Sequence, residues 1–294
     1  MYSLGIDIGG TNVKIAVIDE NDVILHKHSF KSIYGDPTEL VDRICGAFAE
    51  IEIQYNIANV GVCCPGADSK TGYAYADNLG WKAVPLKNII EERLNRTIGF
   101  ANDGAAAMLA ETRKGALKDH KTGVYLTLGT GIGGGFLFDG KPYTGNKGVT
   151  PEFGHMITHG GGRECACGAQ GCFERYASAD ALKKSAPGYG AKKITEMAQT
   201  GDPNMGAIWK AYIKELAVGI IGIMSLLYPE CIVLGGGLSE AGDFLLDSVR
   251  NELKDNEAVR LYYSDICIKL GLFKGDAGIV GAAFLGRENP RKAG

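Results

Sequence analysis

The chain has 294 residues, of which 45% are hydrophobic and 22% are charged, the balance of an ordinary globular protein with room for two hydrophobic cores. Its formal net charge of -3 argues against a nucleic-acid partner. The most apolar stretch, residues 217–228, is shorter than the roughly 20 residues that a membrane span needs. The N-terminus also lacks the basic region of a signal peptide. We therefore expect a cytoplasmic protein with no membrane partner.

The first part of the chain alternates short strands with helices. Strands are expected at 2–8, 13–18 and 23–30, with the spacing of a β-meander and a glycine turn at 9–12. A helix over 37–55, a central strand over 59–64 and a helix over 85–94 follow. A short strand at 97–101 then leads into an alanine-rich helix at 103–114.

The pattern restarts near residue 122. A strand at 122–128, a glycine turn at 129–135 and a second strand repeat the arrangement of the N-terminus, which suggests an internal duplication. A long helix over 203–227, a strand at 231–234, a helix over 240–255, a strand at 266–270 and a final helix over 276–286 complete the chain. The alternation favours an α/β fold with a mixed sheet, and the duplication suggests two lobes. We place the smaller lobe at 1–117 plus 277–294 and the larger at 118–276.

Three glycine-rich turns, at 9–12, 129–135 and 235–237, follow apolar strands. Such turns expose backbone N–H groups and let a phosphate approach closely, and Asp7 at the end of its strand is suited to a hydrated magnesium ion. No Walker P-loop or dinucleotide fingerprint is present, and the first turn taken alone could equally be a plain hairpin. Taken together, the turns predict a nucleotide held between two lobes. The expected nucleotide contacts are Asp7, Gly9, Gly10, Thr11, Asn12, Lys14, Thr130, Gly131, Gly133, Gly134 and Gly236.

Asn102 and Asp103 lie at a strand-to-helix junction. Either residue could simply cap the helix. Alternatively, Asp103 is a general base, because phosphoryl transfer to a sugar hydroxyl needs a carboxylate that accepts the hydroxyl proton. Asn102 would then orient another hydroxyl of the sugar.

A histidine and three closely spaced cysteines, His155, Cys165, Cys167 and Cys172, form a Cys₃His set typical of structural zinc. Four protein ligands leave no open position, so we expect the zinc to be structural. Free thiols on a loop are the alternative. The other cysteines are scattered through apolar segments, and we expect them to be buried as small hydrophobic residues. Because the cytosol is reducing, we expect no disulfides among them. They are Cys45, Cys63, Cys64, Cys231 and Cys267.

With these motifs the sequence resembles the ROK family of bacterial sugar kinases and repressors over nearly its whole length. The resemblance rests on DxGGT at 7–11, Asn102-Asp103, the second turn at 128–135, ExGH at 152–155 and CxCGxxGCxE at 165–174. Phe153 stands where the family usually has Ile or Val. Repressor members carry an N-terminal helix-turn-helix, for which we expect no room before residue 7.

The resemblance implies a two-lobed actin/hexokinase-like (ribonuclease H-like) fold with a central cleft, ATP-Mg as donor and Asp103 as the base. It also implies a homo-oligomer, a dimer or tetramer, and a sugar site made of Gly66, Asn102, Asp103, Glu152, His155 and Glu174.

The leading hypothesis is a glucokinase that phosphorylates the 6-hydroxyl of a hexose. An N-acetylmannosamine or N-acetylglucosamine kinase is the main alternative, ahead of a fructokinase or allokinase. A sugar-binding regulator without catalysis, and a non-kinase ATPase of the same fold, are less favoured because the base, the phosphate turns and the sugar-site residues are all present.

Overall fold

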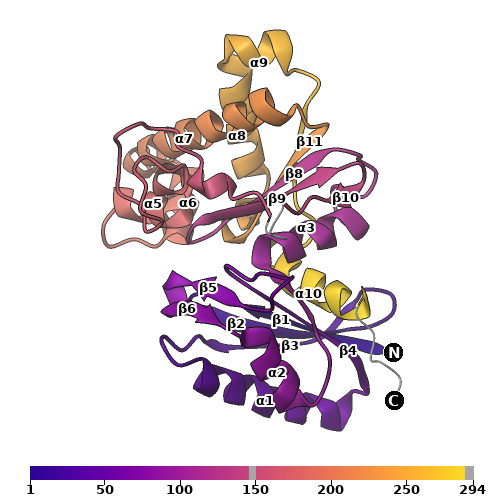
Figure 1. The fold of residues 1–294 in the computed structure, drawn as a ribbon. Helices are drawn as coiled ribbons and strands as arrows, with labels where there is room; N and C mark the ends of the chain where they lie inside the picture. Colours follow the sequence, from indigo (N-terminus) through magenta and orange to yellow (C-terminus); the bar gives the residue numbers. More distant parts are fainter. Residues whose placement is uncertain (146–149, 289–294) are drawn as a thin grey trace. The chain divides into compact units, whose positions relative to one another are not determined.

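The computed structural model describes residues 1–145 and 150–288 (Figure 1). The chain divides into two compact units. Unit 1 comprises Met1–Ala110 with the described parts of Thr144–Thr150 and Asp276–Gly294, and unit 2 comprises Glu111–Tyr143 and Pro151–Gly275. The lobes expected at 1–117 with 277–294 and at 118–276 stay a prediction, because two compact units do not by themselves show which residues move together as a lobe.

Unit 1 contains a five-stranded mixed sheet in the order β3-β2-β1-β4-β7. Strands β1, β4 and β7 are parallel, whereas β2 and β3 are antiparallel to their neighbours. The strands are β1 (Tyr2–Ile8), β2 (Asn12–Ile18), β3 (Ile24–Lys31), β4 (Ile57–Cys64) and β7 (Gly99–Asn102). A small hairpin of β5 (Ala74–Ala76) and β6 (Trp81–Val84), joined by the 3-10 turn η1 (Asp77–Leu79), was not predicted.

The helices of unit 1 begin where the sequence indicates. In α1 (Pro37–Gln54) the Asp36 carboxylate accepts a hydrogen bond from Thr38 N at 2.7 Å, and Pro37 occupies the first turn, where no N–H is needed. Leu40, Ile44 and Phe48 bury one face of α1. The other helices are α2 (Leu86–Leu94), α3 (Asp103–Arg113) and α10 (Ala277–Glu288).

Glycines let α10 approach the parallel strands of unit 1 unusually closely. A Cβ atom at Gly61 of β4 would lie 1.7 Å from the carbonyl oxygen of Ala282, and one at Gly5 of β1 would lie 1.9 Å from that of Ile279. On α10 itself, a Cβ at Gly281 would lie 1.7 Å from Ala106 O of α3. Backbone therefore packs on backbone, and no side chain fits at these positions.

Unit 2 repeats the topology of unit 1. Its sheet has the order β10-β9-β8-β11-β12, with β8, β11 and β12 parallel and β9 and β10 antiparallel. Each strand of unit 1 thus has a counterpart with the same direction and neighbours, as the repeated strand-turn-strand pattern indicated. The strands are β8 (Gly123–Leu128), β9 (Ile132–Phe138), β10 (Lys141–Pro142), β11 (Cys231–Gly235) and β12 (Cys267–Leu270).

Unit 2 also holds the longest described helix, α7 (Pro203–Leu227), whose buried residues join the hydrophobic core against β8 and β11. The remaining α-helices are α4 (Glu174–Ala177), α5 (Ala179–Ser185), α6 (Ala191–Gln199), α8 (Asp243–Asp255) and α9 (Glu257–Tyr262). Short 3-10 turns are η2 (Phe153–His155), η3 (Gly237–Ala241) and η4 (Lys274–Asp276). The helix expected over 240–255 was wrong at its start, since Gly242 separates η3 from α8.

The expectation that no cysteine forms a disulfide was also wrong. Parallel pairing sets Cys231 of β11 directly opposite Cys267 of β12, with their Cα atoms 4.5 Å apart, and the two form a disulfide bond. The 36 residues between them in the sequence concealed this pairing, which only the register of the two strands creates. Among the described residues, no helix combines the length and the apolarity that crossing a membrane requires.

Candidate active site and metal centre

The parallel strands of unit 1 end at one edge of its sheet, and the predicted polar residues lie there. Asp7 is near the end of β1, Gly66 follows β4, and Asn102 ends β7 before Asp103 opens α3. In open α/β sheets the carboxyl edge of the parallel strands is where ligands bind. Unit 1 therefore gathers Asp7, the first glycine turn and the Asn102-Asp103 pair, although they are far apart in the sequence.

The first glycine turn connects β1 to β2. Gly9 N donates to Asn12 O at 3.0 Å, and Ser32 supports the turn by donating its N–H to Thr11 O and its hydroxyl to Gly9 O, at 3.1 and 2.5 Å. Thr11 and Asn12 are exposed. The turn thus has a fixed shape and leaves its tip open, as a phosphate-binding turn requires.

Asp7 has a polar environment that the sequence alone did not reveal. Register places it opposite Lys14 of β2 and opposite Cys63 of β4, and the Cys63 thiol donates to the Asp7 carboxylate at 3.7 Å. Burial, reinforced by the nearby charge of Asp103, raises the pKa of Asp7 to about 6, while Lys14 opposes the rise. A carboxylate destabilised in this way gains from a cation beside it, so Asp7 fits a magnesium-binding role.

Asn102 and Asp103 form the helix cap that the sequence allowed, and their roles as sugar ligand and general base stay predictions. The side-chain oxygen of Asn102 accepts from Gly104 N at 2.8 Å, and the Asp103 carboxylate accepts from the same N–H at 2.9 Å. Asn102 also accepts from the Thr150 hydroxyl at 3.4 Å. The pair therefore caps α3, yet burial still raises the pKa of Asp103 above its ordinary value. A raised pKa in a general base brings it nearer to the working pH.

Gly66 lies where the chain turns back after β4. A Cβ atom there would be 1.9 Å from Tyr75 O, and Tyr75 N donates to Gly66 O at 3.1 Å. Gly66 is thus required for the docking of β5. This close contact explains the glycine without any sugar, and its role in sugar binding stays a prediction.

In unit 2 the second and third glycine turns lie against each other. A Cβ at Gly236, whose φ is +78°, would come within 2.9 Å of the backbone of Leu128, the residue that opens the second turn. A Cβ at Gly134 would be 2.3 Å from Tyr125 O, whereas one at Gly133 would make only an ordinary contact with Thr127 Cβ at 4.0 Å, and Thr130 is exposed. Gly134 and Gly236 are thus demanded by packing, and Thr130 and Gly133 remain accessible to a ligand.

The second turn also contacts a predicted sugar-binding carboxylate. A Cβ at Gly131 would lie 2.5 Å from Glu174 Oε2 at the start of α4. The turn is anchored by Gly129 O, which accepts from Ala179 N of α5 at 2.8 Å. Unit 2 therefore brings the nucleotide turn and Glu174 together.

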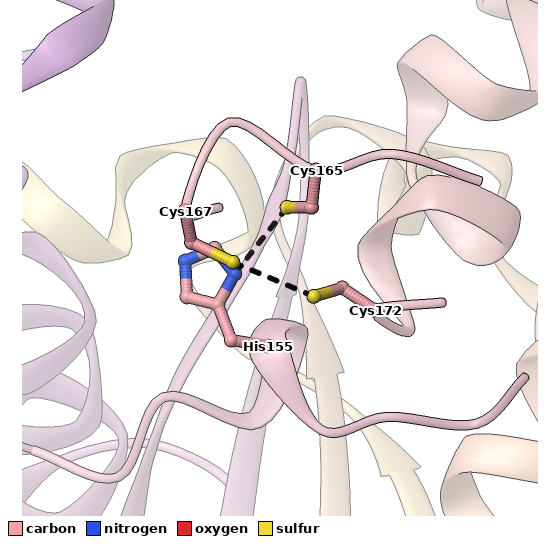
Figure 2. Close-up of side chains that lie close together, drawn as sticks. All are labelled: His155, Cys165, Cys167 and Cys172. Carbon is pink, nitrogen blue, oxygen red and sulfur yellow. Dashed lines mark hydrogen bonds between the residues drawn. The ribbon is translucent and has the colours of Figure 1, made fainter. Parts of the chain in front are cut away.

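Figure 2 shows that His155, Cys165, Cys167 and Cys172 point toward a common centre. Their ligand atoms all lie within 4.8 Å of one another. Cys165 Sγ is 3.7 Å from His155 Nδ1, and Cys167 Sγ is 3.6 Å from Cys172 Sγ. A tetrahedral zinc ion with its usual bond lengths separates two sulfurs by about 3.8 Å and a sulfur from a nitrogen by about 3.5 Å. These two separations match a zinc ion, and the four residues form a donor set of the right kind and size for it.

The loop that carries the predicted metal ligands is held by backbone pairing. Residues on either side of the loop pair through an Ile157–Cys172 bridge, and Phe173 N donates to Met156 O at 2.8 Å. This pairing connects the segment that carries Glu152 and His155 to the segment that carries Cys172 and Glu174. Glu174 further accepts from the Cys165 thiol at 3.3 Å. One connected loop thus carries the two predicted sugar carboxylates, Glu152 and Glu174, and the four residues of the metal set, His155, Cys165, Cys167 and Cys172.

The sequence analysis missed the aromatic support of this loop. The ring of His159 stacks on Tyr176 with centroids 3.9 Å apart, and the Arg163 guanidinium lies over the same ring at 4.6 Å. The Tyr176 hydroxyl accepts from Arg163 N at 2.7 Å. No motif marks these residues, because their contact arises only when the loop closes.

A family model described as the ROK family matches residues 3–289. A glucokinase of Streptomyces coelicolor is 33% identical, covering 97% of this chain and 98% of its own length. An N-acetyl-D-glucosamine kinase of Shigella boydii is 31% identical over 80% of this chain and 84% of its own length. The crystal structure of a ROK family glucokinase from Streptomyces griseus, in complex with glucose and AMPPNP, matches with a TM-score of 0.88 and 31% identity, covering 98% of this chain and 100% of that one.

Proposed function

Since this chain belongs to the ROK family, has its actin-like two-domain fold and is an ATP-dependent sugar kinase, we propose that it phosphorylates the 6-hydroxyl of a hexose, with glucose as the preferred substrate. The observation that carries the proposal is the half-buried Asp103 carboxylate at the carboxyl edge of the unit 1 sheet, beside Asn102 and near Asp7. This arrangement supplies a base of raised pKa next to a carboxylate suited to magnesium.

In this mechanism Asp103 accepts the proton of the 6-hydroxyl as the oxygen attacks the γ-phosphate. Asn102, Glu152, His155 and Glu174 bind the other sugar hydroxyls, and Gly66 lies near the ring. The turns containing Gly9, Gly10, Thr11 and Asn12 in unit 1, and Thr130, Gly131, Gly133, Gly134 and Gly236 in unit 2, hold the nucleotide, together with Lys14. Magnesium, when bound near Asp7, neutralises phosphate charge.

We further propose that the four residues of the metal set bind a structural zinc ion that fixes the sugar-binding loop. The donor set supports this, since three thiolates and an imidazole suit zinc and leave no position for substrate. His155 would use one ring nitrogen for the metal and keep the other for a sugar hydroxyl. The chain is proposed to assemble as a dimer or tetramer, which light scattering on the purified protein would measure.

The sugar is tested by coupled ADP release over a panel of glucose, N-acetylglucosamine, N-acetylmannosamine, fructose and allose. We expect the highest kcat/KM with glucose, in line with the S. coelicolor relative. A higher value with N-acetylglucosamine would instead favour the activity named for the S. boydii relative. Turnover with none of the panel would refute the proposed substrate class.

The base is tested with Asp103→Asn. We expect kcat to fall by about 10²–10⁴-fold, while calorimetry still detects glucose binding. Asp42→Asn, which removes a charge from the exposed side of α1 in the same unit, is the matched control and should keep the wild-type rate. Near-wild-type turnover of Asp103→Asn would show that Asp103 is not the base.

A further inference from the structure

A second group of metal-ligating side chains lies in unit 2, outside the site described above. Cys231 begins β11, Cys267 begins β12, and His120 lies just before β8. These three strands are parallel neighbours in the sheet, and register sets Cys231 opposite both Gly123 of β8 and Cys267 of β12. The group therefore occupies the amino edge of these strands, the opposite edge from the glycine turns that follow β8 and β11.

The geometry of this group suits a small thiophilic cation. One histidine nitrogen and the two sulfurs lie within 4.8 Å of one another. Cys231 is fully buried, whereas Cys267 and His120 are partly exposed, so an ion can reach the group from solvent. Two thiolates and an imidazole form a zinc set that leaves the fourth tetrahedral position to water or to a nearby carboxylate.

Glu230 adds the outer support that metal-bound histidines usually have. Its carboxylate lies 3.3 Å from His120 Nδ1 and accepts from Lys121 N at 3.0 Å. A carboxylate at Nδ1 keeps the proton there and leaves the lone pair of Nε2 for a cation. In the structure Cys231 and Cys267 form a disulfide, and Lys269 lies beside His120 with its Nζ atom 3.1 Å from Nε2. Lys269 is exposed on β12 and is free to turn toward solvent.

We propose that His120, Cys231 and Cys267 bind a second zinc ion when the two cysteines are reduced, and that closure of their disulfide by a low-molecular-weight disulfide expels it. In the oxidation, two zinc-bound thiolates, one external disulfide and two protons give the Cys231–Cys267 bond, two external thiols and free Zn²⁺. The two electrons pass from the cysteine sulfurs to the external disulfide. Because the two Cα atoms are only 4.5 Å apart in the pair, both states fit the same strand register.

The test is the zinc content of the full-length protein, reduced and dialysed against a zinc-buffered solution. We expect two zinc ions per chain in the wild type and one in Cys231→Ser, in His120→Gln and in Cys167→Ala, which lacks the first site. Cys45→Ser, a cysteine of α1 outside both groups, should keep two. His120→Gln alters a partly exposed loop residue, so it remains informative if the buried Cys231 variant fails to fold.

Two further measurements separate the proposal from a purely structural disulfide. Lys269→Gln should bind the second zinc severalfold more tightly, because a competing cation is gone. Oxidised glutathione should lower the zinc content of the wild type from two to one, while a non-reducing peptide map shows Cys231 linked to Cys267. A single zinc in the reduced wild type that Cys167→Ala removes, or a second zinc that persists in both Cys231→Ser and His120→Gln, would overturn the proposal; a single zinc that Cys167→Ala keeps and Cys231→Ser removes would instead refute the zinc of the sugar-binding loop. Zinc loss with both cysteines still open to alkylation would overturn its redox step.

Discussion

Gly61→Ala should destabilise unit 1 because α10 lies directly on β4 at this position. The new Cβ would be 1.7 Å from Ala282 O, whereas an unstrained contact needs about 3.5 Å. The helix backbone would have to retreat by about 2 Å and lose the packing of its buried residues, among them Ile279 and Phe284. Overpacking of this kind costs about 3 kcal/mol or more of the free energy of unfolding.

The assay uses the two tryptophans, because Trp81 is buried in unit 1 and Trp209 in unit 2. In a Trp209→Phe background, fluorescence reports the urea unfolding of unit 1 alone. At about 2 kcal/mol per M urea, Gly61→Ala should lower the midpoint by about 1.5 M.

Gly46→Ala is the matched control. A Cβ at Gly46, in helix α1, meets nothing within 4 Å, so alanine should stabilise unit 1 by about 0.5–1 kcal/mol through its helix propensity. Equal midpoints for Gly61→Ala and its parent would refute the close packing of α10 on β4.

Three other predictions concern the site and its support. Since burial raises the pKa of Asp103 and the base must be ionised, kcat/KM should fall as the pH drops through a pKa above 3.8 and be flat above it; an acid limb at or below 3.8 would contradict this. Cys167→Ala should lose the zinc of the sugar-binding loop and bind glucose about 10-fold more weakly, as measured by calorimetry. Unchanged glucose affinity in a folded, zinc-free variant would show that the zinc is not needed to hold the sugar-binding loop. Glu111→Gln should lower the free energy of unfolding of unit 2 by about 2–4 kcal/mol, because the buried carboxylate accepts from the backbone N–H groups of Ala116, Leu272 and Phe273. Urea unfolding monitored by the fluorescence of Trp209 measures this loss, and an unchanged midpoint would exclude the anchoring role.

The anchoring by Glu111 bears on the division into units. Glu111 begins unit 2 within α3, and its carboxylate holds Leu272 and Phe273, close to Gly275, where unit 2 ends. One buried side chain thus fixes two chain segments that lead from one unit to the other. Glu111 is fully buried, which would disfavour its charge, and the three N–H donors to its carboxylate offset that cost.

Much of this protein could be predicted from sequence because the signals are local. Turn residues, apolar strands and caps act over a few neighbours, so most strands of both sheets, α1 and α7 were predicted nearly at their observed bounds. The prediction was wrong for β9, which begins at Ile132 inside the expected glycine turn, and β10 was not predicted. The repeated strand-turn-strand pattern suggested an internal duplication, and the two sheets of the structure have the same topology. The metal set was visible because its ligands lie close together in the sequence and are separated by glycines.

Tertiary structure alone decided the contacts between distant segments. Cys63 beside Asp7 and Cys231 opposite Cys267 depend on the register of parallel strands, which no local pattern encodes. The tight glycine at Gly61 exists only because α10, more than 200 residues later, returns to β4. The sequence by itself determined which residue types this protein has available for chemistry. Strand pairing and close backbone packing determined which of these residues contact one another, because contacts between distant segments form only when the whole sheet is assembled.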